Sequence, residues 1–237
     1  MTVSEAIILA GGFGTRLRSV ISDGPKVMAP VNGKPFLHYQ MERLIAGGVR
    51  RIVVSVGYLK ESIINWCDGR YPGIDIDFAI EETPLGTGGG IVNALRKCHT
   101  TQVLVLNGDS FFEVNLQHLA DAFFDKQAEC LLGLKVMHQV DRFGTVEMDD
   151  NGRITCFREK RFCEEALINA GVYILDKNRF LARKWPDAFS FEKDYLEKVL
   201  EEDVLFGFIS TGYFIDMGIP EDYARCQKDF LQLFPNS

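Results

Sequence analysis

The chain has 237 residues, of which 46% are hydrophobic and 25% charged, and its formal net charge is −7. These proportions are typical of a globular protein with one sizeable core, and they exclude an extensively disordered chain. An acidic surface repels nucleic acid and anionic lipid, so we expect neither as a partner. Any anionic substrate must then be met by local cations or by a metal.

Targeting and redox signals are also lacking in the sequence. Residues 1–30 contain no cationic start followed by an apolar segment and a cleavage site, and no apolar run reaches membrane-spanning length. We therefore expect a cytoplasmic protein with no membrane partner. The six cysteines show no Cys-x-x-Cys spacing and the four histidines are dispersed. This pattern predicts reduced cysteines and no His/Cys metal cluster.

The first half alternates β-rich apolar runs with helical patterns, which indicates βαβ units and a mainly parallel sheet. Each predicted helix lies between two predicted strands. The predicted strands are Glu5–Leu9, Arg51–Val56, Ile74–Ile80, Gln102–Leu106 and Cys130–Val136. The predicted helices are Phe36–Ala46, Glu61–Trp66, Gly90–Lys97 and Leu116–Lys126.

The pattern changes after Leu134. Thr145–Met148 and Arg153–Phe157 alternate in hydrophobicity and flank an Asn151-Gly152 pair, which predicts a hairpin. No repeat or linker divides the chain, so we predict a single domain over residues 1–237. The remaining predicted elements are two strands, Leu167–Leu175 and Val204–Ser210, and three helices, Lys177–Lys184, Phe191–Glu201 and Pro220–Phe234.

The stretch from Ile7 to Arg18 is the strongest functional signal, because an apolar strand ends in a Gly-Gly-Phe-Gly turn followed by two arginines. Glycines allow backbone N–H groups to approach a bound anion, and Arg16 adds a guanidinium that matches phosphate oxygens. Lys26 follows Pro25 and is placed to act as a second phosphate ligand. Taken alone, Lys26 would be a solvated surface lysine. Together these residues predict a phosphate site.

A second glycine-rich stretch, Pro84–Gly90, is predicted to be a loop between a strand and a helix. In an open α/β sheet this is the edge where ligands bind. Such a loop would expose backbone donors and leave space for a flat base or a sugar. A flexible linker is the alternative, but Ile91–Leu95 continues as an amphipathic helix that would anchor the loop.

Asp109 comes at the end of the predicted strand Gln102–Leu106, and Asp216, within Phe214–Gly218, has the same context of a strand end beside a glycine. A carboxylate at the end of a central strand is costly to bury unless it is paired or bound to a metal, and Mg²⁺ shares such ligands with substrate phosphates. A helix N-cap is the alternative for Asp109. We expect the two aspartates to meet at the sheet edge and to share Mg²⁺. The Glu159-Lys160 pair, taken alone, indicates only a surface ion pair.

These segments, in order, resemble the sugar-1-phosphate nucleotidylyltransferases, and the resemblance spans essentially the whole chain. It implies an α/β fold, a Rossmann-like three-layer sandwich with a mixed, mainly parallel central sheet. It also implies a nucleotide-binding half near residues 1–110 and a sugar-binding half near 111–237. The matching segments are Leu9–Leu17, Pro25–Lys26, Pro84–Gly90, Asn107–Asp109, Glu159–Lys160, Asn169–Val172 and Asp216.

The resemblance implies transfer of a nucleoside monophosphate from a nucleoside triphosphate to a sugar 1-phosphate, with Mg²⁺ as cofactor. It assigns Arg16, Lys26, Asp109 and Lys160 to catalysis, and Asp109 and Asp216 to the metal. The implied nucleotide contacts are Leu9, Ala10, Gly11, Gly12, Gly14, Thr15, Arg16, Lys26, Gly86, Thr87 and Gly88. The implied sugar contacts are Asn107, Gly144, Glu159, Lys160 and Asn169.

The base and the sugar are less constrained. Glu82 can accept both N1–H and N2–H of guanine but would repel the carbonyl oxygens of uracil, so we predict GTP as the donor. Asp141–Val146, Phe189–Glu192 and Tyr213–Tyr223 are most similar to family members that act on a heptose 1-phosphate. The number of subunits stays open, and a homo-oligomer is one option.

Four other readings compete with this one. A mannose-1-phosphate guanylyltransferase and a uridylyltransferase for a hexose or amino-sugar 1-phosphate share the phosphate contacts. A non-catalytic nucleotide-sugar sensor is disfavoured because Asp109, Asp216, Lys26 and Lys160 are all present. A nicotinamide-dependent oxidoreductase is disfavoured because Leu17 stands where its fingerprint has a third glycine.

Overall fold

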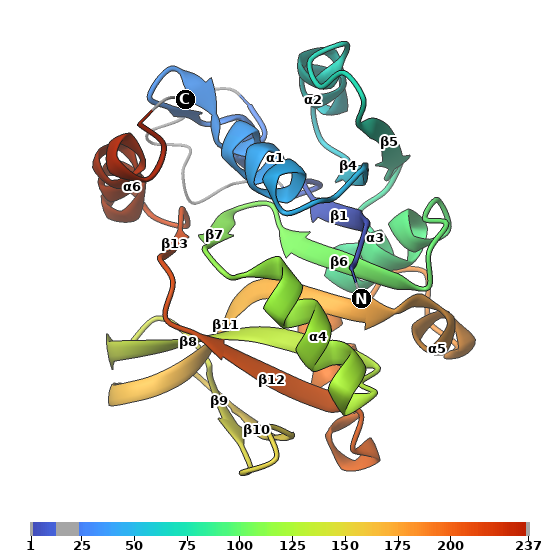
Figure 1. The fold of residues 1–237 in the computed structure, drawn as a ribbon, viewed down its shortest axis with the longest axis vertical. Helices are drawn as coiled ribbons and strands as arrows, with labels where there is room; N and C mark the ends of the chain where they lie inside the picture. Colours follow the sequence, from blue (N-terminus) through green and yellow to red (C-terminus); the bar gives the residue numbers. More distant parts are fainter. Residues whose placement is uncertain (1, 13–23, 236–237) are drawn as a thin grey trace.

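A mixed nine-stranded sheet forms the centre of the protein in a computed structural model, which describes residues 2–12 and 24–235 (Figure 1). Its first part is a block of four parallel strands in the order β6-β1-β4-β5. These strands are rich in Ile, Val and Leu and are mostly buried, as expected of a parallel sheet that is covered on both faces. Their bounds are β1 Glu5–Leu9, β4 Arg51–Val56, β5 Asp75–Ile80 and β6 Gln102–Asn107.

The second part of the sheet is organised around the long strand β11 (Cys163–Asp176). It pairs antiparallel with β6 at its carboxyl end, with β8 along most of its length and with β9 at Leu167 and Ile168, and so joins the two halves of the chain. A hairpin at residues 149–152 connects β9 to β10, as the Asn-Gly pair predicts. The other strands are β8 Cys130–Val140, β9 Thr145–Met148, β10 Ile154–Arg158 and β12 Leu205–Ser210.

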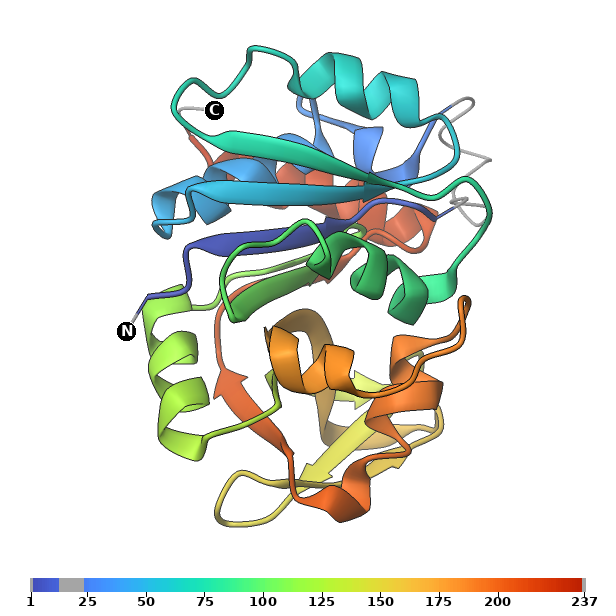
Figure 2. The same ribbon diagram turned by 90° about the vertical axis from the view of Figure 1, so that its right-hand side faces the viewer.

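Helices cover both faces of the sheet (Figure 2). Along β1, Ala6 and Ile8 pack in one buried cluster with α1 and α4, whereas Ile7 packs in another with α3 and α5. This alternation follows from the two-residue period of a strand. The helices are α1 Phe36–Ala46, α2 Lys60–Cys67, α3 Gly86–Leu95, α4 Leu116–Lys126, α5 Lys177–Ala182 and α6 Pro220–Leu233, with shorter turns η2 Lys26–Met28, η3 Phe191–Leu196 and η4 Leu200–Glu202.

A third buried cluster packs α6 against α1 and against a small antiparallel pair, β7 (Ser110–Phe112) and β13 (Phe214–Asp216). Phe230 of α6 stacks with Phe36 and lies edge-on to Phe111. This packing brings the end of β13 next to the end of β6, where the chain enters β7. A two-residue ribbon, β2 (Pro30–Val31) with β3 (Lys34–Pro35), precedes α1.

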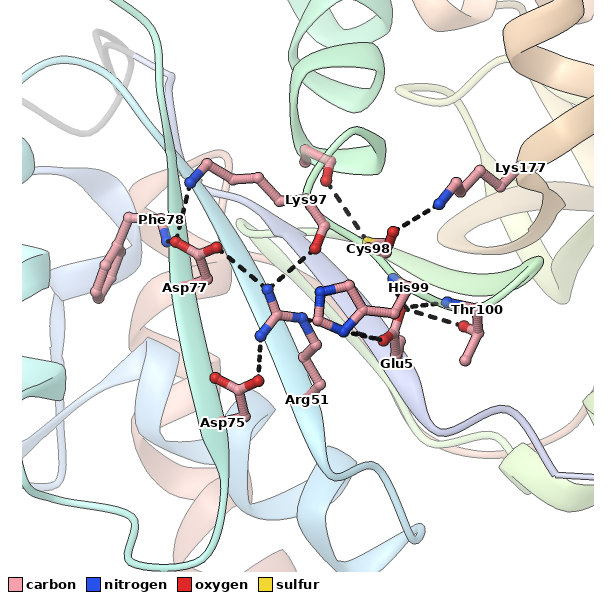
Figure 3. A network of polar contacts seen from close by, with 11 residues as sticks. Glu5, Arg51, Asp75, Asp77, Phe78, Lys97, Cys98, His99, Thr100 and Lys177 are labelled. Atoms are coloured by element: carbon pink, nitrogen blue, oxygen red, sulfur yellow. Dashed lines mark hydrogen bonds and ion pairs between the residues drawn. The ribbon is translucent and has the colours of Figure 1, made fainter.

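The amino ends of the parallel strands are joined by an ionic network (Figure 3). Arg51 pairs with Asp75, donates to Asp77 Oδ2 at 3.2 Å and donates to the Lys97 carbonyl at 3.0 Å. Glu5, which is buried, accepts the backbone N–H groups of residues 99 and 100 at 2.7 and 3.0 Å. These contacts tie β1, β4, β5 and the end of α3 together at one edge of the sheet, and they leave the opposite, carboxyl edge for a ligand site.

The predicted α/β fold with a mixed central sheet is confirmed. Two element predictions were wrong. The helix predicted to begin at Gly90 begins at Gly86. The helix predicted over Phe191–Glu201 is instead the π-helical turn η3 and the short η4, because Glu197 N bonds to the Glu192 carbonyl five residues back. No helix within the described residues has the length and apolar character needed to cross a membrane.

Candidate active site

A cavity of about 790 Å³ opens at the carboxyl edge of the four parallel strands. This is the edge at which parallel α/β sheets bind ligands, because the loops that follow the strands converge there. Ten of the residues predicted to contact substrates lie in its wall: Leu9, Ala10, Gly11, Gly12, Lys26, Glu82, Gly86, Thr87, Asn107 and Asp109. Gly14, Thr15 and Arg16, which complete the predicted phosphate turn, lie outside the described residues.

The two predicted metal ligands converge on one lysine at this edge. Lys26 Nζ lies 2.7 Å from Asp109 Oδ2 and 3.6 Å from Asp216 Oδ1. The lysine side chain is 12% exposed, whereas the Asp109 and Asp216 side chains are 45% and 30% exposed, so water partly screens both ion pairs. Pro25, in an extended conformation, directs the chain into η2, which carries Lys26 to the cavity.

Backbone contacts hold both aspartates in place. Gly108 N donates to the Leu9 carbonyl and Met217 N donates to the Asp109 carbonyl, at 3.0 and 2.9 Å. Gly108 must be glycine here, because a Cβ would lie 2.2 Å from the Leu9 carbonyl oxygen. Asp216 is paired with Ser110 in the register of β13 and β7. The carboxylates are thus positioned by β1, β6, β7 and β13 together.

The donor set at Asp109 and Asp216 fits a hard divalent cation that also binds phosphate. Both side chains offer carboxylate oxygens, the ligand type that Mg²⁺ prefers, and both face the same cationic atom. No group of three or more His, Cys, Asp or Glu side chains within residues 2–12 and 24–235 is arranged to hold a metal. A cation at this point would therefore need further ligands from substrate phosphates or water.

Two adjacent glutamates of the cavity wall, Glu81 and Glu82, differ in how firmly their carboxylates are held. Glu82, the predicted reader of the base, has a side chain that is 80% exposed and pairs with Lys60 Nζ at 3.1 Å. Glu81 accepts hydrogen bonds from Ser55 Oγ at 2.8 Å and from Leu85 N at 3.2 Å. Its carboxylate fills the space beside Gly11, where an added Cβ would lie 2.6 Å from Oε1. Glu81 is therefore held in a fixed position, whereas Glu82 lies at the rim.

The second glycine-rich stretch is not a loop, contrary to the prediction. Gly86–Gly90 form the first turns of α3, and only the first of these glycines lines the cavity. Gly88 and Gly89 are buried under residues 187–189, where a Cβ would lie 2.1 Å from Phe189 Cε2 and 2.5 Å from the Asp187 carbonyl oxygen. These glycines serve close packing. Gly88, predicted as a nucleotide contact, is therefore not part of the cavity wall.

The predicted sugar residues fall into two groups. Asn107 lies in the cavity wall, and Asn169 donates to the Tyr173 hydroxyl at 2.9 Å on the neighbouring strand. A β-bulge at Gly171, whose φ is +72°, turns the backbone so that Gly171 lies against Asn107. Gly144, Glu159 and Lys160 belong to loops around β9 and β10, and none of them lines the cavity. Glu159 and Lys160 are exposed.

A family model described as nucleotidyl transferase matches residues 5–232, nearly the whole described chain. The chain belongs to this family. It is 45% identical over 225 residues to D-glycero-alpha-D-manno-heptose 1-phosphate guanylyltransferase from Aneurinibacillus thermoaerophilus, which covers 95% of this chain and 97% of the relative. The protein of the same name from Campylobacter jejuni is 41% identical, covering 92% of this chain and 96% of the relative.

A solved structure of a related protein has the same fold. HddC from Yersinia pseudotuberculosis, complexed with GMP-PN, matches the fold with a TM-score of 0.85 and 36% identity. The match covers 96% of this chain and 100% of HddC. The cavity described above thus belongs to a nucleotidyl transferase with a nucleotide-bound structural relative.

Sequence reasoning missed part of this nucleotidyl transferase site. Gly57, Tyr58 and Lys60 follow β4 directly, so their place after a parallel strand was a usable signal. Glu192 does not follow a parallel strand, and the resemblance of Phe189–Glu192 to heptose 1-phosphate enzymes assigned it no role. It reaches the cavity from η3, and only the packing of residues 187–191 against α3 brings it there.

Proposed function

We propose that this nucleotidyl transferase transfers GMP from GTP to the phosphate of D-glycero-α-D-manno-heptose 1-phosphate and releases pyrophosphate. The observation that carries the chemistry is that Lys26, which lies in the cavity wall with Asp109, contacts both Asp109 and Asp216. The choice of substrates is supported by the two heptose 1-phosphate guanylyltransferases and by the complex of HddC with GMP-PN.

The reaction requires no protein nucleophile. A phosphate oxygen of the sugar 1-phosphate attacks the α-phosphorus of the nucleotide, and the bond to the pyrophosphate leaving group breaks in line. The protein must bring two anions together, so its role is positioning and charge neutralisation. Lys26 supplies a point charge for phosphate oxygens, and we assign the same task to Arg16 in the glycine turn and to Lys160 on the sugar side.

Asp109 and Asp216 would hold Mg²⁺ in this scheme. When bound, the ion would neutralise negative charge on the substrate phosphates and hold their oxygens in place. In the absence of substrate, Lys26 neutralises the same two carboxylates. Without the lysine, these carboxylates would repel each other and any approaching phosphate.

A fixed carboxylate near the base would explain a preference for guanine. Glu82 is the residue predicted for this role, but the geometry favours Glu81, because Ser55 and the Leu85 N–H hold its carboxylate while Glu82 is bound to Lys60 at the rim. We therefore infer that Glu81 accepts the N1–H and N2–H groups of guanine. Inosine triphosphate lacks the N2 amino group, so it separates the two glutamates experimentally.

The test of the proposed function is a matrix of nucleotides and sugar phosphates. GTP, ITP, UTP, CTP and dTTP are each combined with heptose 1-phosphate, mannose 1-phosphate and glucose 1-phosphate, and pyrophosphate release is measured with and without Mg²⁺. We expect Mg²⁺-dependent turnover that is highest with GTP and the heptose. Preference for UTP, or binding without turnover, would refute the proposal.

The two glutamates are distinguished in the same assay. Glu81→Gln, but not Glu82→Gln, should reduce the preference for GTP over ITP.

A further inference from the structure

Four carboxylates of the described residues line the cavity, and one of them has neither a role in the scheme above nor a basic partner among these residues. Asp109 is paired with Lys26, Glu82 with Lys60, and Glu81 accepts from Ser55 and Leu85. The fourth, Glu192, has no Lys or Arg partner in residues 2–12 and 24–235.

Hydroxyl groups hold the Glu192 carboxylate in place. Its Oε2 atom accepts hydrogen bonds from Thr87 Oγ1 at 2.9 Å and from Ser190 Oγ at 3.1 Å. Thr87 in turn accepts the backbone N–H of Phe191 at 2.9 Å. One oxygen of the carboxylate is therefore fixed at the first turn of α3, and no donor in the described part of the chain contacts the other oxygen, Oε1.

The surroundings of Glu192 include the two asparagines that the sequence assigns to the sugar. Phe191 lies against the Tyr173 ring, with ring centroids 5.0 Å apart, and the Tyr173 hydroxyl accepts from Asn169. Burial, and next the negative charge of Glu192, raise the pKa of the Tyr173 hydroxyl. Asn107 also bonds to the Tyr173 side chain and lies in the cavity wall. Glu192 thus shares its neighbourhood with both asparagines assigned to the sugar.

A carboxylate in a cavity for two phosphate-bearing substrates repels the phosphates. Because the scheme above assigns the metal to Asp109 and Asp216 and the base to Glu81, the remaining favourable partner for this carboxylate is a neutral part of the substrate that carries donors, and the ring of a sugar offers several hydroxyl groups. A hydrogen bond from a hydroxyl to an ionised carboxylate is stronger than one between neutral groups. A substrate that lacks the hydroxyl leaves the carboxylate unpaired and is rejected.

We propose that Glu192 accepts hydrogen bonds from ring hydroxyl groups of the sugar 1-phosphate and is a specificity-determining residue for the sugar, an inference that rests on the proposed function. The residue acts on a part of the substrate remote from the phosphates. Its substitution should therefore alter recognition of the sugar and leave recognition of the nucleotide intact.

The test compares Glu192→Gln with Glu197→Gln, an exposed carboxylate on the same segment, in the full chain. Steady-state kinetics are measured with GTP and heptose 1-phosphate, and then with a series of monodeoxy mannose 1-phosphates. For Glu192→Gln we expect the KM for the sugar phosphate to rise about tenfold or more and the KM for GTP to stay unchanged. The analogue that the unsubstituted protein rejects most strongly should no longer be rejected by this variant. Glu197→Gln should match the unsubstituted protein throughout.

The alternatives give different results. If Glu192→Gln retains the discrimination between sugar and deoxy-sugar, or raises only the KM for GTP, the inference is wrong while the proposed function stands. If the unsubstituted protein transfers nucleotide to none of the sugar phosphates, both fail. Glu192→Asp provides a second variant should Glu192→Gln not fold, because it retains the charge but draws the carboxylate back by one methylene. It too should lose the discrimination, and a retained discrimination would overturn the inference.

Discussion

Lys26 Nζ and Asp109 Oδ2 lie 2.7 Å apart although 83 positions separate them in the chain. The same ammonium group lies 3.6 Å from Asp216 Oδ1. A single cation thus joins the first βα connection, the end of β6 and the end of β13. This arrangement brings both carboxylates to Lys26, which lines the cavity together with Asp109, so one cation bound there could contact both aspartates.

Replacing either aspartate should abolish turnover without unfolding the protein. For Asp109→Asn and Asp216→Asn we expect kcat to fall about 10²-fold or more, because a group that stabilises charge in the transition state is lost. Pyrophosphate release measures the effect, and thermal unfolding verifies the fold. Asp125→Asn, at an exposed position of α4, is the matched control. Normal turnover in both active-site variants would refute the metal assignment.

The glycines of α3 should be sensitive to a single added methyl group. Gly88→Ala places a Cβ 2.1 Å from Phe189 Cε2, so we expect a loss of about 1–3 kcal/mol in the free energy of unfolding. Urea denaturation measures this loss. Combining Gly88→Ala with Phe189→Leu should recover part of the lost stability, because leucine leaves room for the added methyl group. Gly24→Ala should have little effect, because no atom of the described residues beyond its chain neighbours would lie within 4 Å of the added Cβ. Equal stability of Gly88→Ala and Gly24→Ala would contradict the packing role.

The ionic network at the amino edge should affect stability but not catalysis. Arg51→Met removes the guanidinium that contacts Asp75, Asp77 and the Lys97 carbonyl. We expect a loss of about 1 kcal/mol in unfolding free energy, because Asp75 is exposed and Asp77 keeps its ion pair with Lys97, so that the change removes solvent-screened ion pairs and the hydrogen bond to the Lys97 carbonyl. The kcat should be unchanged well below the melting temperature, since the cavity lies at the other edge. Arg96→Met, on the exposed side of the same region, should be neutral. A large fall in kcat for Arg51→Met would show coupling between the two edges.

His38 should make the protein less stable in mild acid. Burial, and then the nearby charge of Lys34, lower the pKa of His38 below its usual 6.5. Lys34 Nζ lies 3.2 Å from His38 Nε2, and the Tyr71 hydroxyl lies 3.0 Å from Nδ1. The unfolded chain binds the proton more readily than the folded one. The contribution is therefore present above pH 6.5 and is lost as the pH falls through the lower pKa of the folded state.

Urea denaturation at about pH 7.5 and about pH 5.5 measures the effect of His38. His38→Gln should reduce the difference in unfolding free energy between the two pH values, whereas His118→Gln, at an exposed position, should retain it. An unchanged difference in His38→Gln would show that other groups cause the pH dependence.

Local pattern was sufficient for most elements. β1, β4, β9, α1 and α4 have the predicted bounds, because alternation or helical periodicity is encoded within each segment. The same local signals placed Gly11, Gly12, Lys26 and Asp109 at the edge of the sheet. The carboxyl ends of parallel strands lie at the same edge of a sheet, so the parallel arrangement alone predicts that the residues following these strands lie close together.

Contacts between distant segments decided the rest. The sequence alone predicted a loop at Gly86–Gly90, since it does not show that Phe189 covers this stretch and requires glycine inside a helix. Likewise, Glu192 enters the cavity through a hydrogen bond to Thr87, 105 positions away, and Asp216 meets Lys26 only because α6 packs β13 against β7. Residue type and spacing determined the elements and the chemistry of the phosphate site. Long-range packing determined which glycines and carboxylates line the cavity, because the contacts of a segment depend on residues that are distant in the sequence.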